Sequence, residues 1–327
     1  MRVLVTGGAG FIGSHVVDQL VRGGHEPRIL DLVPSRYHEP SAVPCIVGDL
    51  RDPETATRAL AGCDAVMHLA AVADVDLVTK DPATADDVNV RGTQVLLECA
   101  RNGGIERFVY ASTIWVYGDA TDPTPLEETT PLGLPRHFYT ATKIAGEMYT
   151  VSYGELYGLD WTILRFGIPY GPRARATAVV PAFAAKALAG QPLTIAGDGT
   201  QVRRFVYVED LAEGCVAALA PAGVNRIYNL VGEETTSVRA IARTIRDVVG
   251  NVPIVHGPGR VGDLHGGNVS GLRAFEELGW RATTPFADGV RRYVDWVTAD
   301  AETPSAAIVV STDGSAAAVA RQDPAAP

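Results

Sequence analysis

The chain has 327 residues, of which 46% are hydrophobic and 20% charged, so it can bury the core of one large domain or two interlocked ones. Its formal net charge of −10 disfavours nucleic acid and anionic membranes as partners. The four cysteines include no CxxC pair, which speaks against a metal site, and we expect them to be buried, reduced thiols, which fits a cytoplasmic protein.

Strands and helices alternate along the first half of the chain. Residues 2–6 predict a strand, a glycine turn follows, and residues 11–22 place apolar side chains on one helical face. The alternation continues with strands over 26–32, 45–47, 65–69, 107–111 and 160–166, and with helices over 53–61, 86–102 and 138–156. Strands joined by helices of this length predict an α/β fold with a Rossmann-type, doubly wound parallel sheet.

After residue 168 the pattern changes. Residues 169–175 are rich in Pro, Gly and Arg, residues 177–189 predict a helix, and mixed elements run to about 298. We expect a smaller C-terminal substrate domain here, placed over the end of the sheet. Residues 300–327 are dominated by Ala, Pro, Ser, Thr and Asp, which predicts a disordered tail.

Three glycines, Gly7, Gly10 and Gly13, follow the first strand directly and open the first helix. Residues without a Cβ let the backbone approach a pyrophosphate closely, and the helix N-terminus offers unpaired N–H groups and partial positive charge to that anion. In this setting the spacing predicts a dinucleotide site. A glycine turn that binds no ligand is the alternative.

Two acidic residues follow the second and third strands. Asp31 can accept hydrogen bonds from ribose hydroxyls and repels a 2′-phosphate, so it favours NAD over NADP, although Arg36 lies close by in the sequence. Asp49 either faces the adenine or caps the helix that begins at Pro53.

Tyr139 and Lys143 lie four residues apart on a predicted helix and therefore share one face. Thr113 follows the strand over 107–111, at the edge where open α/β sheets bind ligands. A lysine ammonium lowers the pKa of a nearby phenol, so Tyr139 can act as a general base while Thr113 binds the substrate hydroxyl. The alternative is that Tyr139 packs in the core and Lys143 is a solvated helix residue.

These residues, together with further motifs, resemble the extended short-chain dehydrogenase/reductase family, in particular its NAD-dependent nucleotide-sugar epimerase/dehydratase group. The motifs are TGGAGFIGSH at 6–15, GDL at 48–50, HLAA at 68–71, NVRGT at 89–93, YASTIWVYG at 110–118, YTATK at 139–143, RFGIPYGPR at 165–173, RRFVYVEDLA at 203–212 and LGW at 278–280. The resemblance covers about residues 1–297.

The resemblance implies an NAD-binding Rossmann domain over 1–168, to which about 203–230 returns, and a nucleotide-sugar-binding domain over about 169–202 and 231–299. It implies an NAD site formed by Gly7, Gly10, Phe11, Ile12, Gly13, Asp31, Asp49, Leu50, Leu69, Ala70, Ala71, Asn89, Tyr139 and Lys143. It implies that Arg203 and Arg260 hold the diphosphate of a UDP-sugar, for which paired guanidinium groups are well suited. It also implies a homodimer formed through a helix bundle that includes the helix of Tyr139 and Lys143.

Two departures from the family pattern bear on the activity. In the family's 4,6-dehydratases, acidic residues follow the catalytic Thr and help to expel water, whereas this chain has Ile114 and Trp115 there. Ile168 stands where many members carry an asparagine that contacts the phosphates. Arg173 or Arg175 can compensate for that asparagine, recognise a sugar carboxylate, or lie solvated on a loop.

These features predict an isomerase, an NAD-dependent nucleotide-sugar 4-epimerase that works through a transient 4-keto intermediate. Its substrate is predicted to be a UDP-hexose (glucose/galactose) or a UDP-hexuronate (glucuronate/galacturonate). The enzyme alternatives are a nucleotide-sugar 4,6-dehydratase and a 4-keto reductase. A dinucleotide-binding sensor or scaffold is the alternative without catalysis, and the set Thr113, Tyr139 and Lys143 disfavours it.

Overall fold

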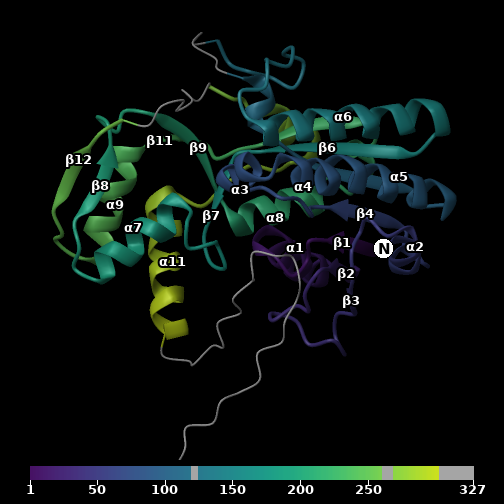
Figure 1. Cartoon of the computed structure of the whole chain (residues 1–327), viewed down its shortest axis with the longest axis horizontal. Helices are drawn as coiled ribbons and strands as arrows, with labels where there is room; N and C mark the ends of the chain where they lie inside the picture. Colours follow the sequence, from purple (N-terminus) through teal and green to yellow (C-terminus); the bar gives the residue numbers. More distant parts are fainter. Residues whose placement is uncertain (119–123, 260–267, 302–327) are drawn as a thin grey trace, which may run out of the picture.

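The computed structural model describes residues 1–118, 124–259 and 268–301. Within these residues, the largest sheet has seven parallel strands in the order β10-β6-β5-β4-β1-β2-β3 (Figure 1). Its strands are β1 (Arg2–Thr6), β2 (Glu26–Asp31), β3 (Cys45–Val47), β4 (Ala65–His68), β5 (Arg107–Thr113), β6 (Asp160–Phe166) and β10 (Arg226–Leu230). The strand order reverses between β1 and β4, which is the point where doubly wound sheets bind ligands. The predicted Rossmann-type fold is confirmed.

Helices cover both faces of this sheet, as buried central strands require. On one face, α1 (Phe11–Arg22) and α8 (Val208–Ala217) pack together, with Val16, Val17 and Leu20 of α1 fully buried (Figure 1). The other face is covered by α2 (Pro53–Leu60), α5 (Gly92–Asn102) and α6 (Phe138–Tyr157). Most of the apolar stripe predicted for the first helix is therefore buried, but Val21, which belongs to the predicted stripe, is 50% exposed.

Residues 86–102 are helical as predicted, but the helix is not a regular α-helix. The structure has α3 (Val75–Lys80), α4 (Pro82–Asp86), one π-helical turn (Asp87–Arg91) and then α5. The extra residue that a π turn inserts changes which side chains face inward, and such turns are frequent at functional sites. Asn89 lies in this turn and is buried.

A smaller part of the chain lies beyond the C-terminal ends of the central strands, at the left of Figure 1. It contains a three-stranded sheet of β7 (Ile168–Tyr170), β9 (Val202–Tyr207) and β11 (Thr235–Ser237), and a parallel pair of β8 (Leu193–Ala196) and β12 (Ile254–Gly257). Its helices are α7 (Val179–Leu188), α9 (Val238–Val249) and α11 (Phe286–Ala301).

Residues 203–230 are divided between the two parts. Strand β9 belongs to the small sheet. Strand β10 is part of the large sheet, and α8 packs on the face of the large sheet that α1 covers. Helix α10 (Leu272–Leu278) also packs on β10, although its residues fall in the predicted substrate domain. The tail predicted over 300–327 lies almost wholly outside the described residues.

Candidate functional site

A cavity of about 610 Å³ opens at the carboxyl ends of the central strands. It is lined by predicted site residues from seven regions of the chain: Gly7, Gly10, Phe11, Ile12, Gly13, Asp31, Asp49, Leu50, Leu69, Ala70, Ala71, Thr113, Tyr139 and Arg175. The structure therefore brings the glycine turn, the acidic residues and two of the three predicted catalytic residues to one space.

The glycine turn is packed too tightly for side chains. Gly7 has a left-handed backbone (φ +70°), and a Cβ there would lie 2.9 Å from backbone atoms of Ala70. A Cβ on Gly13 would lie 2.1 Å from the Gly7 carbonyl oxygen. Helix α1 begins directly behind the turn, and no side chain caps its first N–H groups. This cradle fits the pyrophosphate of a dinucleotide.

Asp31 and Asp49 lie at the same end of the cavity. Asp31 Oδ2 accepts a hydrogen bond of 3.0 Å from the Ala9 N–H, and burial raises the pKa of this carboxyl. Asp49 accepts hydrogen bonds from Arg51 Nε at 3.0 Å, and Arg51 also pairs with Asp87. The cap of α2 is Asp52, which leaves the adenine side as the position expected for Asp49.

A buried hydrogen-bond network supports the wall formed by residues 69–73. His68 contacts Thr6 Oγ1 through Nδ1 at 2.7 Å and Thr93 Oγ1 through Nε2 at 2.9 Å. Burial, and then the nearby Lys143, lower the pKa of His68 to about 3, so its ring is neutral. Asn89 is not among the residues that line the cavity. Its side chain accepts a hydrogen bond from the Val72 N–H and donates one to the Val72 carbonyl, and Val72 does line the cavity.

Thr113 and Tyr139 both line the cavity, Thr113 from β5 and Tyr139 from α6. Thr113 is the last residue of β5, two residues beyond the predicted end of that strand. Tyr139 lies in the first turn of α6, and its carbonyl accepts a hydrogen bond of 2.7 Å from Thr142 Oγ1. Asn89 donates to the same Thr142 hydroxyl at 3.1 Å, so the wall beside the cofactor and the tyrosine are joined.

Lys143 lies behind Tyr139 and is 3% exposed. Its Nζ donates a hydrogen bond of 2.9 Å to the Ala111 carbonyl and lies 5.9 Å from the centre of the Tyr139 ring. The predicted lowering of the Tyr139 pKa is wrong for the protein alone: burial raises this pKa to about 12 and lowers that of Lys143 to about 8. In both cases desolvation outweighs the opposing charge, which is Arg175 for the pKa of Tyr139 and Glu147 for the pKa of Lys143.

A buried ion pair joins Arg165 of β6 to Glu147 of α6. Arg165 contacts Glu147 through Nε at 3.0 Å and through Nη2 at 2.8 Å, and both side chains are at most 3% exposed. Ser112 donates to the same carboxylate at 2.5 Å. Because Ser112 precedes Thr113 and Glu147 follows Lys143 by one turn, this cluster fixes β5 and α6 relative to each other.

The predicted arginines have different surroundings. Arg175 lines the cavity and forms an ion pair of 3.0 Å with Asp74. Arg173 does not line it; the guanidinium pairs with Asp18 on α1 at 2.8 Å. Arg203 lies on β9 outside the lining and donates to the Val202 carbonyl. Arg260 lies outside the described residues.

Several residues at the site are not among the predicted ones. Arg51, which holds Asp49, and Val72, which Asn89 holds, both line the cavity. The sequence signal that could have indicated Arg51 is an arginine two residues after an acid at the end of a strand. Ser112 and Glu147 gave no signal, because their contact joins residues 35 positions apart.

Comparison with known proteins assigns the chain to a family. Residues 3–231 match the NAD dependent epimerase/dehydratase family. The chain belongs to this family. It is 36% identical to a UDP-glucose 4-epimerase of Mycolicibacterium smegmatis, over 90% of this chain and 98% of that protein. A crystal structure of the UDP-glucose 4-epimerase of Thermus thermophilus in complex with NAD is 38% identical, with a TM-score of 0.84, and the match covers 91% of this chain and 99% of that one.

Members of the epimerase/dehydratase family with other activities are similar as well. A trifunctional UDP-glucose 4,6-dehydratase/UDP-4-keto-6-deoxy-D-glucose 3,5-epimerase/UDP-4-keto-L-rhamnose-reductase of Arabidopsis thaliana is 31% identical over 92% of this chain, which spans 47% of that protein. Family membership makes the protein an NAD-dependent enzyme, and the glycine cradle fits that cofactor. Among the described residues, no helix is long and apolar enough to cross a membrane.

Proposed function

We propose that the protein is a nucleotide-sugar 4-epimerase that acts on a UDP-hexose or a UDP-hexuronate. The observation that carries this proposal is the make-up of the cavity around Thr113 and Tyr139. Among its described lining residues, the carboxylates are Asp31, which accepts a hydrogen bond from the glycine turn, and Asp49, which pairs with Arg51. Ile114 and Trp115 follow Thr113, so no acid stands there to protonate a departing hydroxyl, and Trp115 itself lines the cavity.

The chain's own groups suit a reaction at one sugar carbon. Tyr139 removes the proton of the sugar 4-hydroxyl, and Thr113 holds that hydroxyl by a hydrogen bond while the proton leaves. Lys143, fixed on Ala111, places a positive charge beside Tyr139 and stabilises the phenolate. NAD held on the glycine turn and beside Asp31 would supply the hydride acceptor and donor that inversion at C4 needs.

Arg175 is the proposed determinant of the sugar class. Its side chain is 52% exposed, so it can leave its pair with Asp74 and reorient toward a ligand carboxylate, whereas the side chain of Arg173 is only 19% exposed. If Arg175 binds a carboxylate at C6 of the sugar, the substrate is a UDP-hexuronate. If Arg175 instead binds a phosphate, in the role of the family's asparagine that is Ile168 here, the substrate is a UDP-hexose. We propose Arg203 and Arg260 as diphosphate ligands, and we do not propose Arg173, because Asp18 already holds it.

A dehydratase or a 4-keto reductase is the second candidate. Dehydratase and reductase activities are named for the plant relative, so the family alone does not decide. Asp31, which lines the cavity, disfavours an NADPH-using reductase, and Arg36, which could favour NADPH, stacks on Tyr37 outside the lining.

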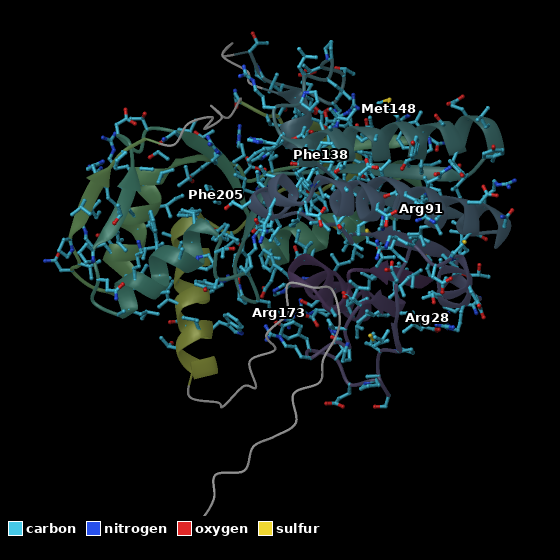
Figure 2. The ribbon with its side chains drawn as sticks, viewed as in Figure 1. Arg28, Arg91, Phe138, Met148, Arg173 and Phe205 are labelled. Atoms are coloured by element: carbon cyan, nitrogen blue, oxygen red, sulfur yellow. The ribbon has the colours of Figure 1, made fainter. Side chains whose placement is uncertain are left out.

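We also propose that the protein is a cytoplasmic homodimer. Helix α6 exposes Phe138 (44%) and Met148 (48%), which are labelled in Figure 2, and also Tyr149 (37%) and Leu156 (71%), an apolar set for a surface helix. A bundle formed with the same helix of a second copy would bury them. Sedimentation of Met148→Glu/Leu156→Glu tests this: a monomer is expected, and an unchanged dimer would contradict the proposed interface.

The activity is tested by incubating the purified protein with UDP-glucose and, separately, with UDP-glucuronate, and resolving the products by NMR. A C4 epimer formed without net release of NADH is expected from one of them. Thr113→Val is the matched variant, because it keeps the shape of the side chain and removes its hydroxyl. A 4-keto-6-deoxy product would overturn the proposal in favour of a dehydratase.

A further inference from the structure

Arg173 joins two walls of the cavity from outside it. Its Nη1 forms an ion pair of 2.8 Å with Asp18 Oδ2 on α1, and its guanidinium stacks over the Tyr37 ring at 4.3 Å (Figure 2). Arg173 thus connects the loop over 169–175 to the helix behind the glycine turn and to the segment after β2.

Neighbouring contacts reinforce this connection. The other oxygen of Asp18 contacts His38 Nε2 at 3.0 Å, and His38 Nδ1 contacts Ser35 Oγ at 2.9 Å. His15, also on α1, donates from Nε2 to the Pro172 carbonyl at 3.0 Å. The side chains of Arg173, Asp18 and His38 are 19%, 22% and 7% exposed, so the pair is shielded more than an ordinary surface ion pair.

The backbone of Arg173 is strained. Its φ of +66° lies in the left-handed region, which a residue with a long side chain seldom adopts. Such a conformation persists where the surroundings determine it, and it is common at ligand clamps. The contacts with Asp18 and Tyr37 supply that determination.

The elements joined by Arg173 form the two sides of the cavity. Pro169 of β7 lines one side together with Ala174 and Arg175 of the loop that follows β7. Phe11 and Ile12 of α1 and Asp31 at the end of β2 line the other. A dinucleotide on the glycine turn lies between these two sides. We infer that Arg173 and Asp18 form a clasp that holds the loop over 169–175 closed over bound NAD and slows its loss.

The clasp goes beyond the proposed activity and does not depend on the sugar that the enzyme uses. It suits a reaction in which NAD is reduced and reoxidised within one turnover, because such a cofactor need not exchange. Arg173 and Asp18 are positioning residues in this account, since neither lines the cavity.

The test measures how fast the NAD-loaded protein loses its cofactor after dilution, by quantifying the NAD that stays bound. Asp18→Asn and Arg173→Gln are expected to lose NAD at least about fivefold faster than the wild type. Arg173→Lys keeps the charge but not the planar group, and its rate of NAD loss is expected to lie between those of the wild type and Arg173→Gln. Asp288→Asn, which breaks the exposed pair of Asp288 with Arg291 on α11, is the matched control and should retain NAD as the wild type does.

Two further measurements separate a clasp from a general loss of stability. Trypsin should cleave after Arg175 faster in Asp18→Asn, while the urea midpoint of unfolding stays close to that of Asp288→Asn. Unchanged NAD loss in Asp18→Asn and Arg173→Gln would overturn the clasp. Faster loss accompanied by an equally lowered urea midpoint would also overturn it, because the pair would then only stabilise the fold.

Discussion

Lys143 Nζ donates a 2.9 Å hydrogen bond to the carbonyl of Ala111, two residues before Thr113. This contact ties the first turns of α6 to the end of β5, so the predicted base and the hydroxyl of Thr113 are held at a fixed separation. It also places an ammonium group in a buried position, which has a measurable consequence for stability.

The burial of Lys143 makes stability depend on pH. Its pKa falls from about 10.5 in the unfolded chain to about 8 in the folded protein, so the unfolded state binds more protons between these values. Stability should therefore rise with pH through this window. Lys143→Met lacks this pH-dependent contribution. Between pH 8 and 9.5 the unfolding free energy, measured in urea without NAD, should therefore increase by roughly 1–2 kcal/mol more in the wild type than in Lys143→Met. Parallel curves for the two proteins would show that Lys143 titrates normally.

Removing the phenolic hydroxyl should abolish the chemistry and spare the cofactor. Tyr139→Phe is expected to lower kcat by about 10²–10⁴-fold, because proton transfer by a positioned side chain contributes that much. Bound NAD should remain at the wild-type level, since the glycine turn and Asp31 are untouched. Turnover at the wild-type rate would exclude Tyr139 as the base.

The buried ion pair between Arg165 and Glu147 should be sensitive to loss of one partner. Glu147→Ala leaves the Arg165 charge without its carboxylate and is expected to cost about 3–5 kcal/mol in urea unfolding. Asp288→Asn, at an exposed pair, should change stability by less than about 0.5 kcal/mol. Equal effects of the two substitutions would contradict the role assigned to burial.

The glycines of the turn should differ in their tolerance of a methyl group. Gly13→Ala places a Cβ 2.1 Å from the Gly7 carbonyl oxygen, so the turn must move, at a cost of about 1–3 kcal/mol, and NAD affinity should fall. Gly10→Ala is the comparison, because its Cβ would lie 3.2 Å from the same oxygen. Calorimetric titration with NAD distinguishes them, and equal affinities would mean that the cradle tolerates a displaced backbone.

Much of the fold could be predicted because its signals are local. The glycine spacing, the apolar face of α1 and the alternation of strands and helices are readable over short windows. Thr113 and Tyr139 could be placed at one sheet edge because parallel strands share their carboxyl ends. The π turn around Asn89 was not predictable, since it depends on packing against α6 rather than on a local pattern.

The partners of the arginines could not be predicted from sequence patterns. Arg173 and Arg175 are two residues apart in one loop, yet one pairs with Asp18 outside the cavity and the other lines it. The partner of Arg173 lies 155 positions away, and no motif indicates that contact. A guanidinium in a ligand-binding loop therefore predicts an anionic partner, but not whether that partner belongs to the ligand or to the chain.

The most direct test of the proposed epimerase follows a deuterium label at C4 of the substrate. UDP-glucose and UDP-glucuronate carrying deuterium at C4 are converted by the NAD-loaded protein in ordinary water, and the products are examined by NMR and mass spectrometry. Return of the same hydride predicts a C4 epimer of one of them that retains the deuterium at C4. A product that has lost the deuterium, or a 4-keto-6-deoxy sugar in its place, would contradict the proposal.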